Sequence, residues 1–169
     1  LAARRLGSPI LRVVIDTPEE RPAVDRIVAQ LAQVVPVFEE TGIVLAIENH
    51  DRLAVHQLAG IIRQINSEHV GICLDTANSF GAMEGPGAVV ETLGSYAVNL
   101  HLKDIAVRRF PHAQGFTIEG RPAGHGMLDI PWLLERLREF GRDLNAIIEL
   151  WAPPEASIEE TMRKEAQWA

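Results

Sequence analysis

The sequence has little cysteine, little basic charge and no long apolar run, and each scarcity excludes a class of protein. Cys73 is the single cysteine of the 169 residues, so no internal disulfide forms, as is compatible with a reducing cytoplasm. Lys and Arg total 16 against 23 Asp and Glu, and the net charge of -7 disfavours nucleic acid, whose phosphates bind basic side chains. No stretch approaches the roughly 20 apolar residues that cross a bilayer, and no leader pattern opens the chain. We therefore expect a cytoplasmic protein without nucleic-acid or membrane partners.

The remaining composition is typical of one globular domain over residues 1–169, since 47% of the residues are apolar. Five apolar runs rich in β-branched residues predict buried strands. They are ILRVVI (10–15), IVLAIE (43–48), VGICLD (70–75), AVNLHL (97–102) and AIIEL (146–150). Between them, segments with three- and four-residue apolar spacing predict helices. These helical segments span 22–42, 53–67, 87–95 and 130–141.

The alternation of strand and helix, without a hairpin signal, predicts a parallel sheet and an α/β fold. The segment 108–129 is the exception, because it is long, rich in Gly, Pro and His, and without periodicity. We expect it to be a functional loop. The chain begins at Leu1, and LAARRLGSP is typical of a last helical turn before a glycine stop, so we expect it to begin inside a longer fold.

Residues able to bind a metal close four consecutive strands of the predicted sheet. Glu48 ends IVLAIE and Asp75 ends VGICLD, while His101 lies in AVNLHL and Glu149 in AIIEL. Catalytic groups of parallel α/β folds lie where strands end, so we expect these side chains at one edge. Carboxylate oxygen and imidazole nitrogen are ligands of Mn²⁺, Mg²⁺, Co²⁺ and Zn²⁺. The four residues therefore predict a divalent-metal site.

Each of these residues taken singly has a simpler interpretation, as a strand-end residue that caps the next helix. For Asp75 alone, which precedes a turn, that interpretation is favoured. For four successive strands it is disfavoured, because three crowded carboxylates repel one another unless a cation neutralises them. Cys73 is interpreted as a buried strand thiol rather than as a nucleophile.

The motifs around these residues resemble those of the xylose isomerase-like barrel superfamily, specifically its sugar phosphate isomerase/epimerase branch. That branch includes ketose 3-epimerases, hydroxypyruvate isomerase and inosose dehydratase. The motifs, in the family's order, are AIENH (46–50), CLDTAN (73–78), NLHLKD (99–104), GRPAGHGMLDIPWLLERL (120–137) and IIELW (147–151). The resemblance implies a (β/α)8 TIM barrel of which this chain contains the fourth to eighth strands, with the first three βα units absent.

The resemblance also implies that Glu48 and Glu149 bind the metal and exchange a proton with the carbon next to the substrate carbonyl, one from each face. A metal held by adjacent hydroxyl and carbonyl oxygens acts as a Lewis acid and stabilises a cis-enediolate. Epimerisation, aldose–ketose isomerisation and dehydration share this step. Mn²⁺ is the first expected metal.

Four further residues are predicted to contact the substrate. His50 hydrogen-bonds hydroxyl groups or is an exposed loop histidine, and Asn78 stands where several epimerases have a histidine. Lys103 reaches an anionic oxygen or orients a carboxylate. Arg109 lies in the region where the family places a substrate-binding arginine, although the register there is ambiguous. Asp104 is predicted to support the site or to be an additional ligand.

These features predict a metal-dependent isomerase or epimerase of a small sugar or polyol-derived ketone. A dehydratase of the inosose or dehydroshikimate type is the nearest alternative. The superfamily also contains a nuclease for abasic DNA, which the net charge of -7 disfavours. A non-catalytic partial barrel or sugar-binding module is the alternative from another class; the absent N-terminal units favour it and the intact carboxylates disfavour it. By analogy with related barrels, association into a homo-oligomer is also expected.

Overall fold

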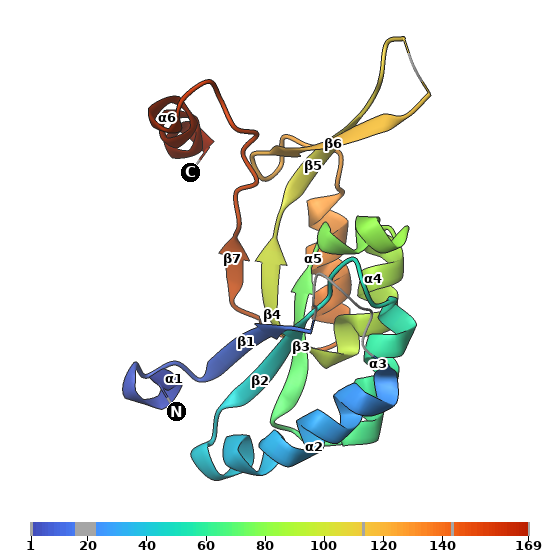
Figure 1. Cartoon of the computed structure of the whole chain (residues 1–169), viewed down its shortest axis with the longest axis vertical. Coiled ribbons are helices and arrows are strands. Elements are labelled where there is room, and N and C mark those ends of the chain that lie inside the picture. The colour runs from blue at the N-terminus through green and yellow to red at the C-terminus, as the bar shows by residue number, and fades with distance from the viewer. Residues whose placement is uncertain (1, 16–22, 113, 143, 169) are drawn as a thin grey trace.

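The computed structural model describes residues 2–15, 23–112, 114–142 and 144–168. It shows an α/β fold with a five-stranded parallel sheet in the order β1-β2-β3-β4-β7 and a separate pair, β5-β6 (Figure 1). The strands are β1 (Ile10–Val14), β2 (Val44–Glu48), β3 (Val70–Asp75), β4 (Ala97–Leu102), β5 (Asp104–Arg109), β6 (Phe116–Arg121) and β7 (Ala146–Ile148). The helices are α1 (Ala2–Arg5), α2 (Val24–Thr41), α3 (Val55–Ile65), α4 (Pro86–Leu93), α5 (Ile130–Glu139) and α6 (Ile158–Trp168), with 3-10 turns η1 (Asn78–Ala82) and η2 (Gly94–Tyr96).

The predicted alternation of strands and helices is confirmed. Each of the five apolar runs contains one strand of the parallel sheet, and each predicted helical segment contains one of α2 to α5. The expected start of the first helix at Pro22 lies outside the described residues. The result is the α/β class with five strands of a partial (β/α)8 TIM barrel. Helix α6 was not predicted; it buries no residue, and its apolar side chains Ile158 and Met162 are exposed.

The two faces of the parallel sheet carry different side chains. Helices α2 to α5 gather on one side of the sheet (Figure 1), and Ile47, Ile72 and Leu74 are fully buried in the core between these layers. Because side chains alternate along a strand, the neighbours of these residues point to the other face. The apolar side chains therefore pack against the helices, while the intervening side chains point to the other face, where a functional site can form. No helix in the described part of the chain has the length and apolar character needed to cross a membrane.

The expectation of an irregular loop over 108–129 was wrong in part. Strands β5 and β6 form an antiparallel hairpin in which Asp104 pairs with Arg121 and Arg109 with Phe116. The segment FTIEGR alternates apolar or small residues with polar ones, as a half-exposed strand does. The signal was short and lacked a two-residue turn, so the absence of a hairpin was also a wrong prediction.

A β-bulge sets the register between β3 and β4. Ile72 is aligned with Ala97 but Cys73 with Asn99, so Val98 is an extra residue on β4. Gly71 makes room for it, since a Cβ at this position would lie 2.5 Å from Val98 Cγ1. The extra residue places His101 directly beside Asp75.

We expect Gly71→Ala to destabilise the fold by about 1–3 kcal/mol, because the new methyl group forces Val98 or the strand to move. Denaturant unfolding measures the loss. The control is Gly60→Ala in α3, where nothing lies within 4 Å and alanine favours the helix. In the double variant with Val98→Ala the loss should fall below the sum of the two single losses; an additive result would contradict this account of the bulge.

Candidate metal centre and adjoining cavity

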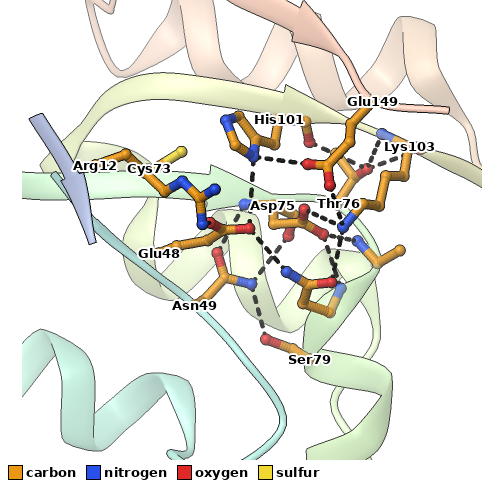
Figure 2. Close-up of polar contacts among 12 residues, drawn as sticks. Arg12, Glu48, Asn49, Cys73, Asp75, Thr76, Ser79, His101, Lys103 and Glu149 are labelled. Atoms are coloured by element: carbon orange, nitrogen blue, oxygen red, sulfur yellow. Dashed lines mark hydrogen bonds and ion pairs between the residues drawn. The ribbon is translucent and has the colours of Figure 1, made fainter. Parts of the chain in front are cut away.

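Four strands of the sheet bring four predicted ligands to one end of the barrel wall (Figure 2). Glu48 and Asp75 end β2 and β3, His101 lies in β4, and Glu149 follows β7 directly. One ligand atom from each lies within 4.8 Å of all the others. Three of the residues are buried, whereas the Glu149 side chain is 43% exposed. The structure thus gathers the predicted ligand set.

The centre of this cluster contains polar atoms that lack hydrogen bonds. His101 Nδ1 lies 3.4 Å from Glu48 Oε1 and 2.8 Å from Glu149 Oε2. Among the described residues, neither His101 Nδ1, Glu149 Oε2 nor Asp75 Oδ2 has a hydrogen bond of acceptable geometry, although Asp75 Oδ2 forms an ion pair with Lys103 Nζ at 2.9 Å. Buried polar atoms are rarely left without partners, and here they converge. Three carboxylates and one imidazole fit a divalent cation by charge and by ligand type.

Asp75 is held so that one carboxylate oxygen remains for the cluster. Its Oδ1 accepts hydrogen bonds from Ala77 N and Asn78 N, both at 2.8 Å, while Oδ2 faces the other ligands. Asn49 fixes the Asp75 backbone by accepting from its N–H at 2.7 Å and donating to its carbonyl at 2.9 Å. Asn49 also donates to Ser79 Oγ. The sequence analysis missed Asn49, although it directly follows a predicted ligand.

Glu48 has both oxygens occupied by side chains that orient it. Arg12 NH1 donates to Oε2 at 2.7 Å, and Asn78 Nδ2 donates to Oε1 at 2.9 Å. Arg12 was also missed, although a charged residue inside the apolar run ILRVVI was a usable signal. Asn78, predicted to contact the substrate, therefore also positions a metal-site carboxylate.

A cavity of about 510 Å³ adjoins the cluster. Three predicted substrate-binding residues, His50, Asn78 and Lys103, line it together with Glu149. His50 Nδ1 donates to Asp51 Oδ1 at 2.6 Å, and this hydrogen bond holds the pKa of Asp51 below its usual value. The apolar part of the wall consists of Ala77, Phe80, Ile118, Leu150 and Trp151. A small molecule with polar and apolar faces would fit this lining.

Arg109 is not brought to the cluster. It ends β5 and lines a separate hollow with Phe110 and His112 on the hairpin. Asp104 was expected either to support the site or to be an additional metal ligand, and in the structure its side chain anchors the loop that follows β6. Its carboxylate accepts hydrogen bonds from the backbone N–H groups of four residues at 2.8–3.2 Å: Ile105, Gly124, Gly126 and Leu128.

Cys73 lies beside the cluster but differs from its members. Together with Glu48 and His101 it forms a second possible ligand group. Burial raises the pKa of the Cys73 thiol to about 12, while Asn99 donates a hydrogen bond to its sulfur. The thiolate is the form that binds metals, so the oxygen-rich set with Asp75 and Glu149 is the stronger cation site.

We expect His101→Ala to lose the bound metal, because it removes the only nitrogen ligand and leaves the carboxylates to repel one another. Elemental analysis after incubation with Mn²⁺, Co²⁺ or Zn²⁺ measures this. His56→Ala, on the exposed side of α3, is the matched control and should retain one ion per chain. Equal metal content in the two variants would rule out the cluster as the binding site.

We expect Asp104→Asn to destabilise the protein by about 2 kcal/mol, because an amide group would then face backbone N–H donors. Asp129→Asn is the control, since Asp129 caps α5 through Trp132 N and asparagine caps helices equally well. Both are compared by denaturant unfolding, and equal midpoints would contradict the role given to Asp104.

Comparison with known proteins supports the fold of the chain. The 3-oxo-isoapionate decarboxylase of Pectobacterium atrosepticum is 37% identical over 166 residues, which cover 98% of this chain and 60% of that protein. The chain thus spans about three fifths of this relative. A xylose isomerase-like TIM barrel protein from Mycobacterium smegmatis, in complex with magnesium, has a TM-score of 0.72 at 14% identity, covering 99% of this chain and 62% of the other. The IOLI protein with a bound zinc atom has a TM-score of 0.70 at 23% identity, covering 98% of this chain and 63% of the other.

The two solved structures share the fold of this chain. The sequence model of the family described as "Xylose isomerase-like TIM barrel" matches residues 2–169. This chain therefore belongs to the xylose isomerase-like TIM barrel family.

Proposed function

We propose that the protein is a metal-dependent enzyme that forms an enediolate or enolate from a small polyhydroxy carbonyl compound. The observation that carries the proposal is the convergence of four ligand atoms, three of which lack hydrogen bonds among the described residues, beside a cavity of about 510 Å³. Glu48, Asp75, His101 and Glu149 would hold the ion, with Mn²⁺ as the first expectation and Mg²⁺, Co²⁺ or Zn²⁺ as alternatives. When bound, the ion supplies Lewis-acid stabilisation of negative charge on substrate oxygen.

The two glutamates are proposed as the acid/base pair. Glu149 is half-exposed, lines the cavity and has an oxygen without a hydrogen bond, so it can reach a substrate proton. Glu48 is buried, and hydrogen bonds from Arg12 and Asn78 orient its carboxylate. His50 and Asn78 supply hydrogen-bonding groups at the cavity wall.

The first candidate reaction is decarboxylation of a 3-oxo sugar acid, and the 37% identical decarboxylase supports it. The bond between the carboxylate carbon and C2 breaks, and its electron pair passes into the enolate of the 3-oxo group. Carbon dioxide leaves, and C2 then takes a proton from the acid group of the site. The residues need only hold the carbonyl near the ion, exclude water and deliver that proton.

The second candidate is isomerisation or epimerisation of a small sugar or sugar-like ketone through a cis-enediolate. The presence of two glutamates, 3.4 Å and 2.8 Å from the same His101 nitrogen, favours it, because one carboxylate could remove the proton and the other return it without a further base. Dehydration of an inosose or dehydroshikimate type of substrate remains an alternative on the same framework. A non-catalytic sugar-binding module would keep the cavity but not need the metal.

We expect the Mn²⁺-loaded protein to release carbon dioxide from a 3-oxo sugar acid and to incorporate one solvent deuterium into the product. Glu149→Gln should lower the rate by about 10²–10⁴-fold, the usual contribution of a positioned acid or base. Glu155→Gln, a nearby exposed glutamate paired with Lys164, is the control. The assays are carbon dioxide release and mass spectrometry in D₂O.

Deuterium exchange into ketoses without carbon dioxide release would favour the second candidate. A protein that binds the metal yet catalyses neither of these reactions nor dehydration of an inosose or dehydroshikimate type of substrate would contradict the proposal and favour the non-catalytic module.

A further inference from the structure

We propose that Lys103 binds the carboxylate of an anionic polyhydroxy substrate, so that the site is built for sugar acids rather than for neutral sugars. The inference rests on the proposed function, because it takes a divalent ion in the cluster of Glu48, Asp75, His101 and Glu149 as given. It goes further by naming the residue that recognises the substrate's carboxylate and by making that recognition a requirement of the site.

The backbone of Lys103 is fixed on both sides by one hydroxyl group. Thr76 Oγ1 accepts from Lys103 N at 2.9 Å and donates to Lys103 O at 2.7 Å. Thr76 directly follows Asp75, so this clamp joins the end of β3 to the residue after β4 (Figure 2). Because these two hydrogen bonds fix the backbone of Lys103, they also hold its side chain in the direction of the cavity, whose wall it lines.

The ammonium group of Lys103 is buried among acceptors. Its side chain is 10% exposed, and Nζ lies 2.9 Å from Asn78 Oδ1, 2.9 Å from Asp75 Oδ2 and 3.5 Å from Glu149 Oε1. A buried cation is strongly unfavourable unless anions compensate it. Two of its three partners are residues that would also bind the metal.

A bound divalent ion changes this balance of charge. The ion and Arg12 together offset the three carboxylates of the cluster, so the charge of Lys103 becomes surplus. Asp75 Oδ2 and Glu149 would be shared with the ion, and the ammonium would then lie close to a second cation. An anion that contacts Lys103 relieves both the excess charge and the repulsion.

Two other acidic residues near the site do not supply that anion. Asp51 accepts from His50 at 2.6 Å and lies 3.6 Å from the Arg52 guanidinium. Asp104 is buried with its oxygens directed to backbone N–H groups of residues 105, 124, 126 and 128. Both carboxylates already have compensating partners, so neither of these two described groups balances Lys103, and a substrate carboxylate could do so.

A carboxylate fits this position better than a phosphate. Among the described residues, Lys103 is the only Lys or Arg that lines the cavity. One surplus positive charge matches a monoanion, whereas a phosphate monoester carries close to two negative charges at neutral pH. The cavity of about 510 Å³ has room for a small sugar acid.

The test is isothermal titration of the Mn²⁺-saturated protein with D-erythronate and with erythritol, which differ only in a carboxylate against a hydroxymethyl group. We expect the wild type to bind erythronate at least about tenfold more tightly than erythritol, because one charge-assisted hydrogen bond contributes about that much affinity. Lys103→Met should bind both equally, and Lys103→Gln is the second variant. Lys164→Met, which removes the chain's other lysine from α6, should keep the preference.

Mn²⁺ affinity, measured separately by electron paramagnetic resonance, distinguishes failure of the proposed function from failure of the role given to Lys103. Mn²⁺ binding at wild-type strength or tighter shows that a Lys103 variant is folded. If the wild type binds Mn²⁺ but holds both probes equally, or if the Lys103 variants keep the preference, the present inference is overturned while the proposed function stands. A protein that binds no Mn²⁺ overturns both.

Discussion

Repulsion among three carboxylates at one end of the parallel sheet is the constraint on which the arrangement of the site depends. Glu48, Asp75 and Glu149 come from three different strands and meet around a single imidazole. Each is offset by another kind of partner: a guanidinium for Glu48, backbone N–H groups for Asp75, and the Lys103 ammonium at 3.5 Å for Glu149. The acidic cluster can persist in the folded state because these partners share its charge without filling its centre.

The ligands divide into a fixed part and an adjustable part. Glu48, Asp75 and His101 are buried in the middle of the sheet, and the first two have further hydrogen bonds that orient them. Glu149 follows a strand of three residues at the sheet edge, and its side chain is 43% exposed. Three oriented, buried side chains together with one half-exposed carboxylate would suit a site that both holds an ion and exchanges protons with a substrate.

Sequence reasoning predicted that Glu48, Asp75, His101 and Glu149 lie together because each ends or interrupts an apolar strand, and parallel strands bring such positions to one edge. It missed Arg12, Asn49 and Thr76, whose roles depend on contacts between strands that are far apart in the chain. It also placed Arg109 with the substrate-binding residues, whereas the hairpin carries this side chain to a separate hollow. The register of the hairpin could not be predicted, because its connecting loop has no turn signature. Local patterns thus predicted what each strand contributes, and tertiary contacts decided how each contribution is oriented.

The bulge at Val98 has a consequence for how the strand can change. The bulge reverses the alternation of side chains along β4: before it, even-numbered residues face the interior of the barrel wall, and after it, odd-numbered residues do. Deletion of Val98 would remove the bulge and leave a regular strand in which Leu100 and Leu102 still face the helices and His101 still lies beside Asp75. A second deletion, with no bulge left to absorb it, would turn His101 toward the helices and Leu100 and Leu102 toward the carboxylates, because side chains alternate along a strand. The strand can therefore lose one residue here without exchanging its faces, but not two.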